Sequence, residues 1–294
     1  MIALLPKMEL LSDEALTPLQ REAIEKYLLV PLNTLAKELP VTEERKVVLE
    51  SIIASEQQWI QSVLNLSVEK RLPSLDNFHF YHGQEAEIIG QEHEQAEGWT
   101  GFSMGAVSYL VEQKFPSETL ATVVHELTHL FSYNEYKLAV KGTFSFARVR
   151  SGYKSPLAGS YHGINEAITE MITIEVREFC RPRGILTGSS ILFSPLVIYI
   201  DLLIKHSAKK KGCDAKSLRH QLYKGYFTGD VSSLALFDVC GKRISNNLIT
   251  LDSSTGNLVV DRDYAHILEQ RISKYETGKE ITILDGIRVK MEEP

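Results

Sequence analysis

The segment that most constrains how this chain can fold is His125-Glu126-Leu127-Thr128-His129, an H-E-x-x-H motif inside a stretch of periodic apolar residues. Those apolar residues recur at the three- and four-residue spacing of one helical face, and they are Leu120, Val123, Val124, Leu127, Leu130 and Phe131. The spacing predicts an amphipathic helix, with Ser117 after Pro116 as its N-cap. On such a helix the two histidines lie one turn apart, on the side opposite the apolar stripe.

Two imidazoles at this spacing can bind one zinc ion, and a carboxylate beside them can accept a proton from water. His125 and His129 are therefore candidate metal ligands, and Glu126 is a candidate general base. The motif alone does not decide the matter, because an amphipathic helix can carry His, Glu and His on its polar face without binding a metal. A third ligand is needed.

A second pair of polar residues lies in the segment Asn165-Glu166-Ala167-Ile168-Thr169-Glu170. Apolar residues at helical spacing accompany it, namely Ile164, Ala167, Ile168, Met171 and Ile172. They predict a second helix with Glu166 and Glu170 one turn apart on its polar side. A catalytic zinc needs three protein ligands and an open position, so Glu166 can supply the third ligand. Glu170 can accept a hydrogen bond from the far nitrogen of His125 and so hold its tautomer.

In these two blocks the chain resembles the gluzincin metallopeptidases, the H-E-x-x-H plus Glu group typified by thermolysin. The resemblance covers roughly residues 98–230. It implies that His125, His129 and Glu166 bind zinc, that Glu126 is the general base, and that Glu170 occupies a place usually held by Asp beside a ligand histidine. It also implies a zincin-like α+β fold, in which a small mixed sheet offers an edge strand to substrate beside the active-site helix. Residues 99–111 match that strand by position.

The chain departs from the family pattern at two points. The gap from His129 to Glu166 is longer than in thermolysin, so a compact, divergent gluzincin is the better description. The family's transition-state donor is a Tyr or His, which does not carry over to one position. Tyr161 and His162, just before the predicted ligand helix, are the leading candidates. The others are Tyr199, His220 and Tyr223.

Competing zinc-peptidase patterns fit less well. The metzincin pattern needs a glycine at position 132 and a ligand at position 135, where this chain has Ser132 and Glu135. Glu135 stays open as a minor alternative for the third ligand, and it requires the helix to break after His129. The three cysteines are widely spaced and form no C-x-x-C pair, which indicates buried thiols rather than disulfides or zinc ligands.

Composition narrows the possible partners. The chain has 294 residues and a net charge of −6, which argues against a nucleic-acid partner. It lacks a signal-peptide pattern and an apolar run long enough to span a membrane, so we expect no membrane span. A cytoplasmic location is the expectation, with secretion by a route that needs no signal left open. The oligomeric state is not predicted.

The pattern of the chain, together with the resemblance to gluzincins, implies three regions. They are a helical N-terminal region over residues 1–75, a zincin catalytic core over 76–185, and a mainly helical C-terminal lobe with a small hairpin over 186–294. The predicted helices cover residues 18–39, 195–209, 214–226 and 264–275, and a further helix begins at Thr42. A strand is predicted at 78–82, a strand or hairpin at 99–111, and a final strand at 281–291 with a turn at Asp285-Gly286. The pattern also predicts a short strand and loop at 85–97, a long polar loop at 136–160, and a hairpin at 247–262.

These features predict hydrolysis of a peptide bond in a peptide or protein substrate, by water that Zn²⁺ and Glu126 activate. The alternative is a non-catalytic zinc-binding module that keeps the zincin fold. An intact Glu126 disfavours this alternative, because a structural zinc site needs no base and usually has four Cys or His ligands. A third and weaker possibility is a helical interaction protein that binds no metal.

Overall fold

The computed structural model describes residues 7–10, 36–67, 73–92, 95, 99–104, 107–112, 116–141, 143–154, 161–185, 194–250, 280–283 and 287–290. The chain divides into two compact units, formed by residues 1–148 with 179–188 and by residues 149–178 with 189–294. Helices predominate and small sheets accompany them, which confirms the predicted α+β class. The predicted helix over 18–39 lies outside the described residues up to residue 35, and it is wrong for residues 36–39, where Leu39 forms an isolated β-bridge with Phe80.

A mixed three-stranded sheet is the centre of the first unit. Its order is β2 (Phe78–Tyr81), β4 (Val107–Val111) and β3 (Gly101–Met104), with β2 parallel and β3 antiparallel to β4. The strands predicted at 78–82 and 99–111 are therefore confirmed, the second as a hairpin. Because β3 is the last strand in this order, it forms an edge of the described sheet.

One face of this sheet packs against the helix α3 (Gln84–Glu92) through aromatic side chains. The rings of Phe102 and Tyr109 stack with their centroids 4.8 Å apart, and Ala86 and Ile89 of α3 join this core. The prediction of a short strand and loop at 85–97 is wrong for the residues of α3. Its buried residues Ala86, Ile89 and Gly90 follow helical spacing, which the acidic character of the segment obscured.

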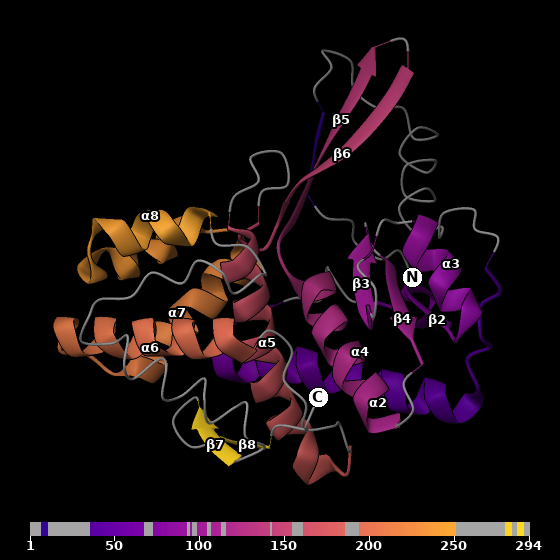
Figure 1. Ribbon diagram of the computed structural model, residues 1–294, viewed down its shortest axis with the longest axis horizontal. Helices are drawn as coiled ribbons and strands as arrows, with labels where there is room; N and C mark the ends of the chain where they lie inside the picture. Colours follow the sequence, from indigo (N-terminus) through magenta and orange to yellow (C-terminus); the bar gives the residue numbers. More distant parts are fainter. Residues whose placement is uncertain are drawn as a thin grey trace. The chain divides into compact units, whose positions relative to one another are not determined.

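The helices α2 (Glu43–Leu64) and α4 (Pro116–Phe131) also belong to the first unit, and α4 packs on β3 and β4 (Figure 1). The helix start predicted at Thr42 is confirmed, and Thr42 is the N-cap of α2, since its hydroxyl accepts a hydrogen bond from the Arg45 amide. The predicted cap of α4 is wrong. The helix begins at Pro116, so Ser117 lies inside it, and proline is favoured at the first helical position because it has no N–H to satisfy.

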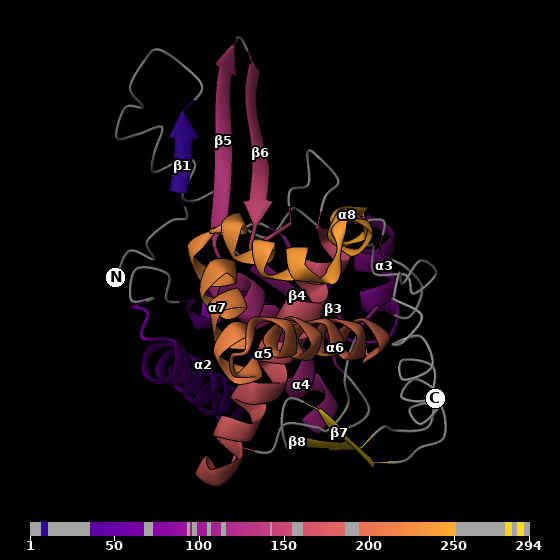
Figure 2. The same ribbon diagram turned by 90° about the vertical axis from the view of Figure 1, so that its left-hand side faces the viewer.

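A second three-stranded sheet has the order β1 (Lys7–Leu10), β5 (Asn134–Lys141) and β6 (Thr143–Ser151), with β5 and β6 forming a long hairpin (Figure 2). The prediction of a polar loop over 136–160 is therefore wrong for residues 136–141 and 143–151. The sequence does carry the signal of a strand here. Apolar residues alternate with others at Tyr136, Leu138 and Val140, and again at Phe144 and Phe146.

The second unit is mainly helical. It contains most of α5 (His162–Cys180), then α6 (Ser194–Lys211), α7 (Ala215–Thr228), the 3₁₀ helix η4 (Val231–Cys240) and α8 (Lys242–Thr250). The helices predicted at 195–209 and 214–226 are confirmed, with Asp214 as the N-cap of α7.

The end of the chain forms an antiparallel pair, β7 (Glu280–Ile283) and β8 (Ile287–Lys290), where one strand with a turn was predicted. Residues 247–250 belong to α8, so the hairpin predicted from 247 is wrong at its start. The rest of that hairpin and the helix predicted at 264–275 lie outside the described residues. Every helix in the described ranges is too short or too polar to cross a bilayer.

Candidate metal centre

The motif helix α4 presents both of its histidines on one side. The ring centroids of His125 and His129 are 4.9 Å apart, and the ring planes meet at 78°. His125 is buried and His129 is half-buried. Two imidazole rings therefore lie within reach of a single small ion.

The apolar stripe of the same helix holds it in place. Val124, Leu127 and Phe131 have no exposed surface. At the C-terminal end, the Asn134 amide donates hydrogen bonds to the carbonyls of His129 (3.3 Å) and Ser132 (3.0 Å). The Ser132 amide and hydroxyl also donate to the His129 carbonyl, so several donors satisfy the carbonyl groups at the end of the helix. The buried apolar face of α4 and the hydrogen bonds at its C-terminal end thus hold the helix that carries both histidines.

Glu126 lies beside the edge strand β3. Its Oε2 accepts a hydrogen bond of 2.6 Å from the Ser103 hydroxyl, which also lies 2.8 Å from the hydroxyl of Ser108 on β4. Gly101 allows this approach, because a Cβ there would lie 2.6 Å from Thr122 Cγ2 and 3.2 Å from Glu126 Oε1. Ser103 was not among the residues predicted from the sequence. The sequence does carry a pattern that indicates this contact. Gly101 and Ser103 are two residues apart, so their positions lie on the same face of a strand.

A buried carboxyl group lies on the other side of the motif. Glu56 of α2 is fully buried, and its Oε1 is 2.8 Å from the hydroxyl of Thr128, the fourth residue of the motif. Its Oε2 is buried without a hydrogen-bond partner among the described residues. Burial raises the pKa of Glu56 to about 8, although the Thr128 hydrogen bond and the nearby His125 oppose this shift. Glu56 therefore remains largely protonated at neutral pH.

Glu56 was likewise not predicted from the sequence, although α2 carries a signal for it. Ile52, Glu56, Trp59 and Ile60 follow the spacing of one helical face, and all four are buried. A glutamate within an apolar stripe indicates a side chain that is neutral or paired.

Glu166 and Glu170 lie one turn apart on α5, and both are buried. Apolar residues of the same helix, Ile164, Ile168 and Ile172, have no exposed surface. The start of α5 is held by Asn165, whose Oδ1 accepts a hydrogen bond of 2.9 Å from the Tyr153 amide. The helix and the spacing that the sequence predicted around Glu166 are thus present.

The two leading candidates for the transition-state donor adjoin α5. Tyr161 has a φ of 63°, a left-handed conformation that is uncommon for an aromatic residue. Its amide donates a hydrogen bond of 2.8 Å to the carbonyl of Ile249 in α8. His162 begins α5, and its Nε2 lies 3.9 Å from Glu166 Oε1. Both side chains are partly exposed, so each retains access to solvent.

The other three candidates are less accessible. Tyr199 and Tyr223 have no exposed surface, and the Tyr223 hydroxyl donates to Glu175 Oε1 at 3.1 Å. Burial raises the pKa of Tyr223 well above its ordinary value. Burial also lowers the pKa of His220, whose Nε2 is 4.0 Å from Glu175 Oε2. Tyr223 and His220 thus take part in a polar cluster around Glu175 within the second unit.

The donor set of the candidate site suits a metal. His125, His129 and Glu166 each offer one ligand atom, and these atoms lie within 4.8 Å of one another, so the group could hold a metal ion. Two imidazole nitrogens and one carboxylate oxygen are a ligand set typical of catalytic zinc. The alternative ligand Glu135 lies in β5, whereas α4 continues beyond His129 to Phe131.

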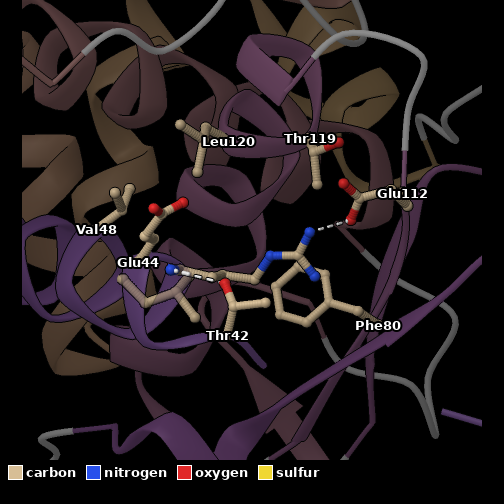
Figure 3. Close-up of a pocket in the computed structure, with 9 residues that line it drawn as sticks. Thr42, Glu44, Val48, Phe80, Glu112, Thr119 and Leu120 are labelled. Atoms are coloured by element: carbon tan, nitrogen blue, oxygen red, sulfur yellow. Dashed lines mark hydrogen bonds and ion pairs between the residues drawn. The ribbon is translucent and has the colours of Figure 1, made fainter. Parts of the chain in front are cut away.

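A separate cavity of about 230 Å³ lies in the first unit, beside the first turns of α2 and α4. Thr119 and Leu120 of α4 face Thr42 and Phe80 across it (Figure 3). The other residues that line it are Glu44, Arg45, Val48, Leu49 and Glu112. None of the candidate metal ligands lines this cavity. The guanidinium of Arg45 lies over the Phe80 ring and donates to Glu112 Oε2 at 2.6 Å, so its charge is compensated.

The chain matches no family model, no curated protein and no solved structure. The likeness to gluzincins therefore depends on the residues of α4 and α5 themselves.

Proposed function

We propose that this chain is a zinc-dependent metallopeptidase, a divergent gluzincin that hydrolyses peptide bonds. The observation that carries the proposal is the group of His125, His129 and Glu166, with Glu126 adjoining it on α4. A zincin-like arrangement is part of the proposal. In it, the edge strand β3 lies beside the motif helix, where an extended substrate can add to the sheet.

The ligand types favour a catalytic site over a structural one. Structural zinc sites usually have four cysteine or histidine ligands, whereas catalytic sites have three protein ligands and an open position. A carboxylate that can accept a proton lies next to His125 in the sequence and is oriented by Ser103. A structural site has no need of such a group.

In this mechanism His125, His129 and Glu166 hold the zinc ion, which when bound supplies a Lewis acid for water and for the scissile carbonyl. Glu126 accepts a proton from the attacking water and later returns it to the leaving nitrogen. Tyr161 or His162 donates a hydrogen bond to the oxyanion that develops on the carbonyl. Glu170 accepts a hydrogen bond from His125 and keeps its ring oriented.

The test combines metal content with turnover. Elemental analysis of the purified protein should give one zinc per chain, and a mixed peptide library should be cleaved in a way that a chelator stops. Glu126→Gln should retain zinc and lose cleavage, whereas His129→Ala and Glu166→Ala should lose zinc. Glu87→Gln is the control, because Glu87 is an exposed carboxylate on α3.

Two results would contradict the proposal. Undiminished cleavage by Glu126→Gln would show that Glu126 is not the general base. Zinc in the wild-type protein without any cleavage would favour the non-catalytic module instead.

A further inference from the structure

Two serines occupy the face of the central sheet that lies against α4. Ser103 of β3 is directly opposite Ser108 of β4 in the antiparallel register, and Ser108 has no exposed surface. The opposite face of the same strands carries the aromatic pair of Phe102 and Tyr109. A buried hydroxyl without a hydrogen bond destabilises the fold, so serines at these positions need polar partners.

The hydroxyls of Ser108 and Ser103 and the carboxylate of Glu126 form a chain of hydrogen bonds in which each serine donates towards Glu126. An ionised carboxylate only accepts, so the Ser103 hydrogen goes to Glu126 Oε2. The oxygen of Ser103 is then available to accept from Ser108, which is 2.8 Å away. The two hydroxyls form a chain that ends on one oxygen of the general base. Hydrogen bonds to a charged acceptor are the stronger kind and restrict the rotamer of the acceptor.

The second oxygen of Glu126 has different surroundings. Oε1 lies 3.2 Å from the position that a Cβ on residue 101 would occupy, and residue 101 is a glycine. Any side chain there would crowd this oxygen. The two oxygens of the Glu126 carboxylate therefore have different surroundings on β3. Ser103 donates a hydrogen bond to Oε2, whereas Gly101 leaves space at Oε1.

We propose that Ser103 is a positioning residue, which holds Oε2 of Glu126 so that Oε1 alone carries the proton during peptide hydrolysis. This role rests on the proposed function. When water attacks, one of its O–H bonds breaks, an Oε1–H bond forms and the carboxylate becomes neutral. When the leaving nitrogen departs, the Oε1–H bond breaks and an N–H bond forms. Ser103 donates to Oε2 throughout, so the carboxyl group need not rotate between the two transfers.

Kinetics and a spectroscopic readout test this role together. Ser103→Ala should lower kcat by about 10- to 100-fold, the effect of losing one hydrogen bond to a charged group. KM for a cleaved peptide and the zinc content should stay within about twofold of wild type. Ser103→Thr keeps the hydroxyl and should restore most of kcat.

Infrared difference spectra of the purified full-length protein, with carboxylate carbon-13 labelling, provide a readout independent of turnover. The band that Glu126→Gln removes belongs to Glu126, and it should shift in Ser103→Ala. Ser108→Ala removes a buried hydroxyl from the same sheet face and should shift the band and lower kcat by less. Ser62→Ala on the exposed side of α2 is the neutral control.

The outcomes distinguish failure of the Ser103 positioning role from failure of the proposed peptidase function. An unshifted Glu126 band in Ser103→Ala overturns the positioning role, whether or not the protein is active. A shifted band with unchanged kcat in an active protein also overturns it. A wild-type protein that binds no zinc or cleaves nothing refutes the proposed function, and with it any catalytic consequence of the Ser103 hydrogen bond.

Discussion

Replacing Glu56 by glutamine should reveal a buried carboxyl group through the pH dependence of stability. Glu56 is fully buried beside Thr128, and its pKa rises from 4.5 to about 8 in the folded protein. In the unfolded chain the side chain is solvated, so its pKa returns to the lower value. Between these two values the unfolded state releases a proton that the folded state keeps.

Stability should therefore fall as the pH rises. Below pH 4.5 both states are protonated, and the stability that the neutral carboxyl group contributes is fully present. As the pH rises towards about 8 the free energy of unfolding should fall, and it should level off above that value. The whole interval corresponds to about 5 kcal/mol, and the part up to pH 7 to about 3 kcal/mol.

Glu56→Gln removes this titration while preserving shape, and the amide can donate to the Thr128 hydroxyl. The variant should match wild type near pH 4.5, exceed it by about 3 kcal/mol at pH 7 and by about 5 kcal/mol at pH 8.5. Urea unfolding at each pH, with a chelator present to remove linkage to metal binding, measures the difference. Glu50→Gln, on the exposed side of the same helix, should change stability by less than about 0.5 kcal/mol at any pH.

A difference between Glu56→Gln and wild type that is constant from pH 4.5 to 8.5 would refute the reasoning. A Glu56→Gln variant less stable than wild type at pH 8.5 would also refute the reasoning. At that pH wild type buries an ionised carboxylate, which destabilises the folded state, whereas the glutamine amide is neutral.

Two further changes probe the second unit. Arg219→Met should lower the free energy of unfolding by about 3–5 kcal/mol, because it removes the Nε that lies 2.8 Å from Glu175 Oε1 and leaves that carboxylate without a cation, with the Tyr223 hydroxyl still donating to it. The double variant with Glu175→Gln should recover part of this loss in urea unfolding, and no recovery would contradict a pairwise origin. Gly152→Ala should lower Tm, because φ is +54° and a Cβ would lie 2.5 Å from Tyr226 Cε2. Gly184→Ala, at φ +78° with no atom within 4 Å, should lower Tm by much less, and equal losses would show that crowding is unimportant.

The elements predicted correctly are those whose signal is local. Thr42 before an apolar-periodic run predicted the start of α2, and Asp214 predicted that of α7, since capping involves residues only a few positions apart. The errors arose where two local signals competed. The acidic residues of 85–97 hid the helix α3, and the lysines, the glycine and the hydroxyl residues among the apolar positions of 136–146 hid the alternation of β5 and β6.

The contacts that surround the motif were beyond prediction for a different reason. Ser103 and Glu126 are 23 residues apart, and Glu56 and Thr128 are 72 residues apart. Nothing in the local pattern of either segment specifies its partner, because such pairs form only when separate elements pack together. The burial of Glu56, and with it the raised pKa, likewise depends on how α2 packs.

The sequence by itself determined that α4 and α5 are helices, and that their histidines and glutamates lie one turn apart on polar faces. It did so because helical periodicity is a property of neighbouring residues. Only the tertiary structure decided that a serine from the edge strand holds the motif glutamate and that a neutral carboxyl group supports the motif from behind. Such contacts depend on the distances between elements, which the spacing of residues along the chain does not specify.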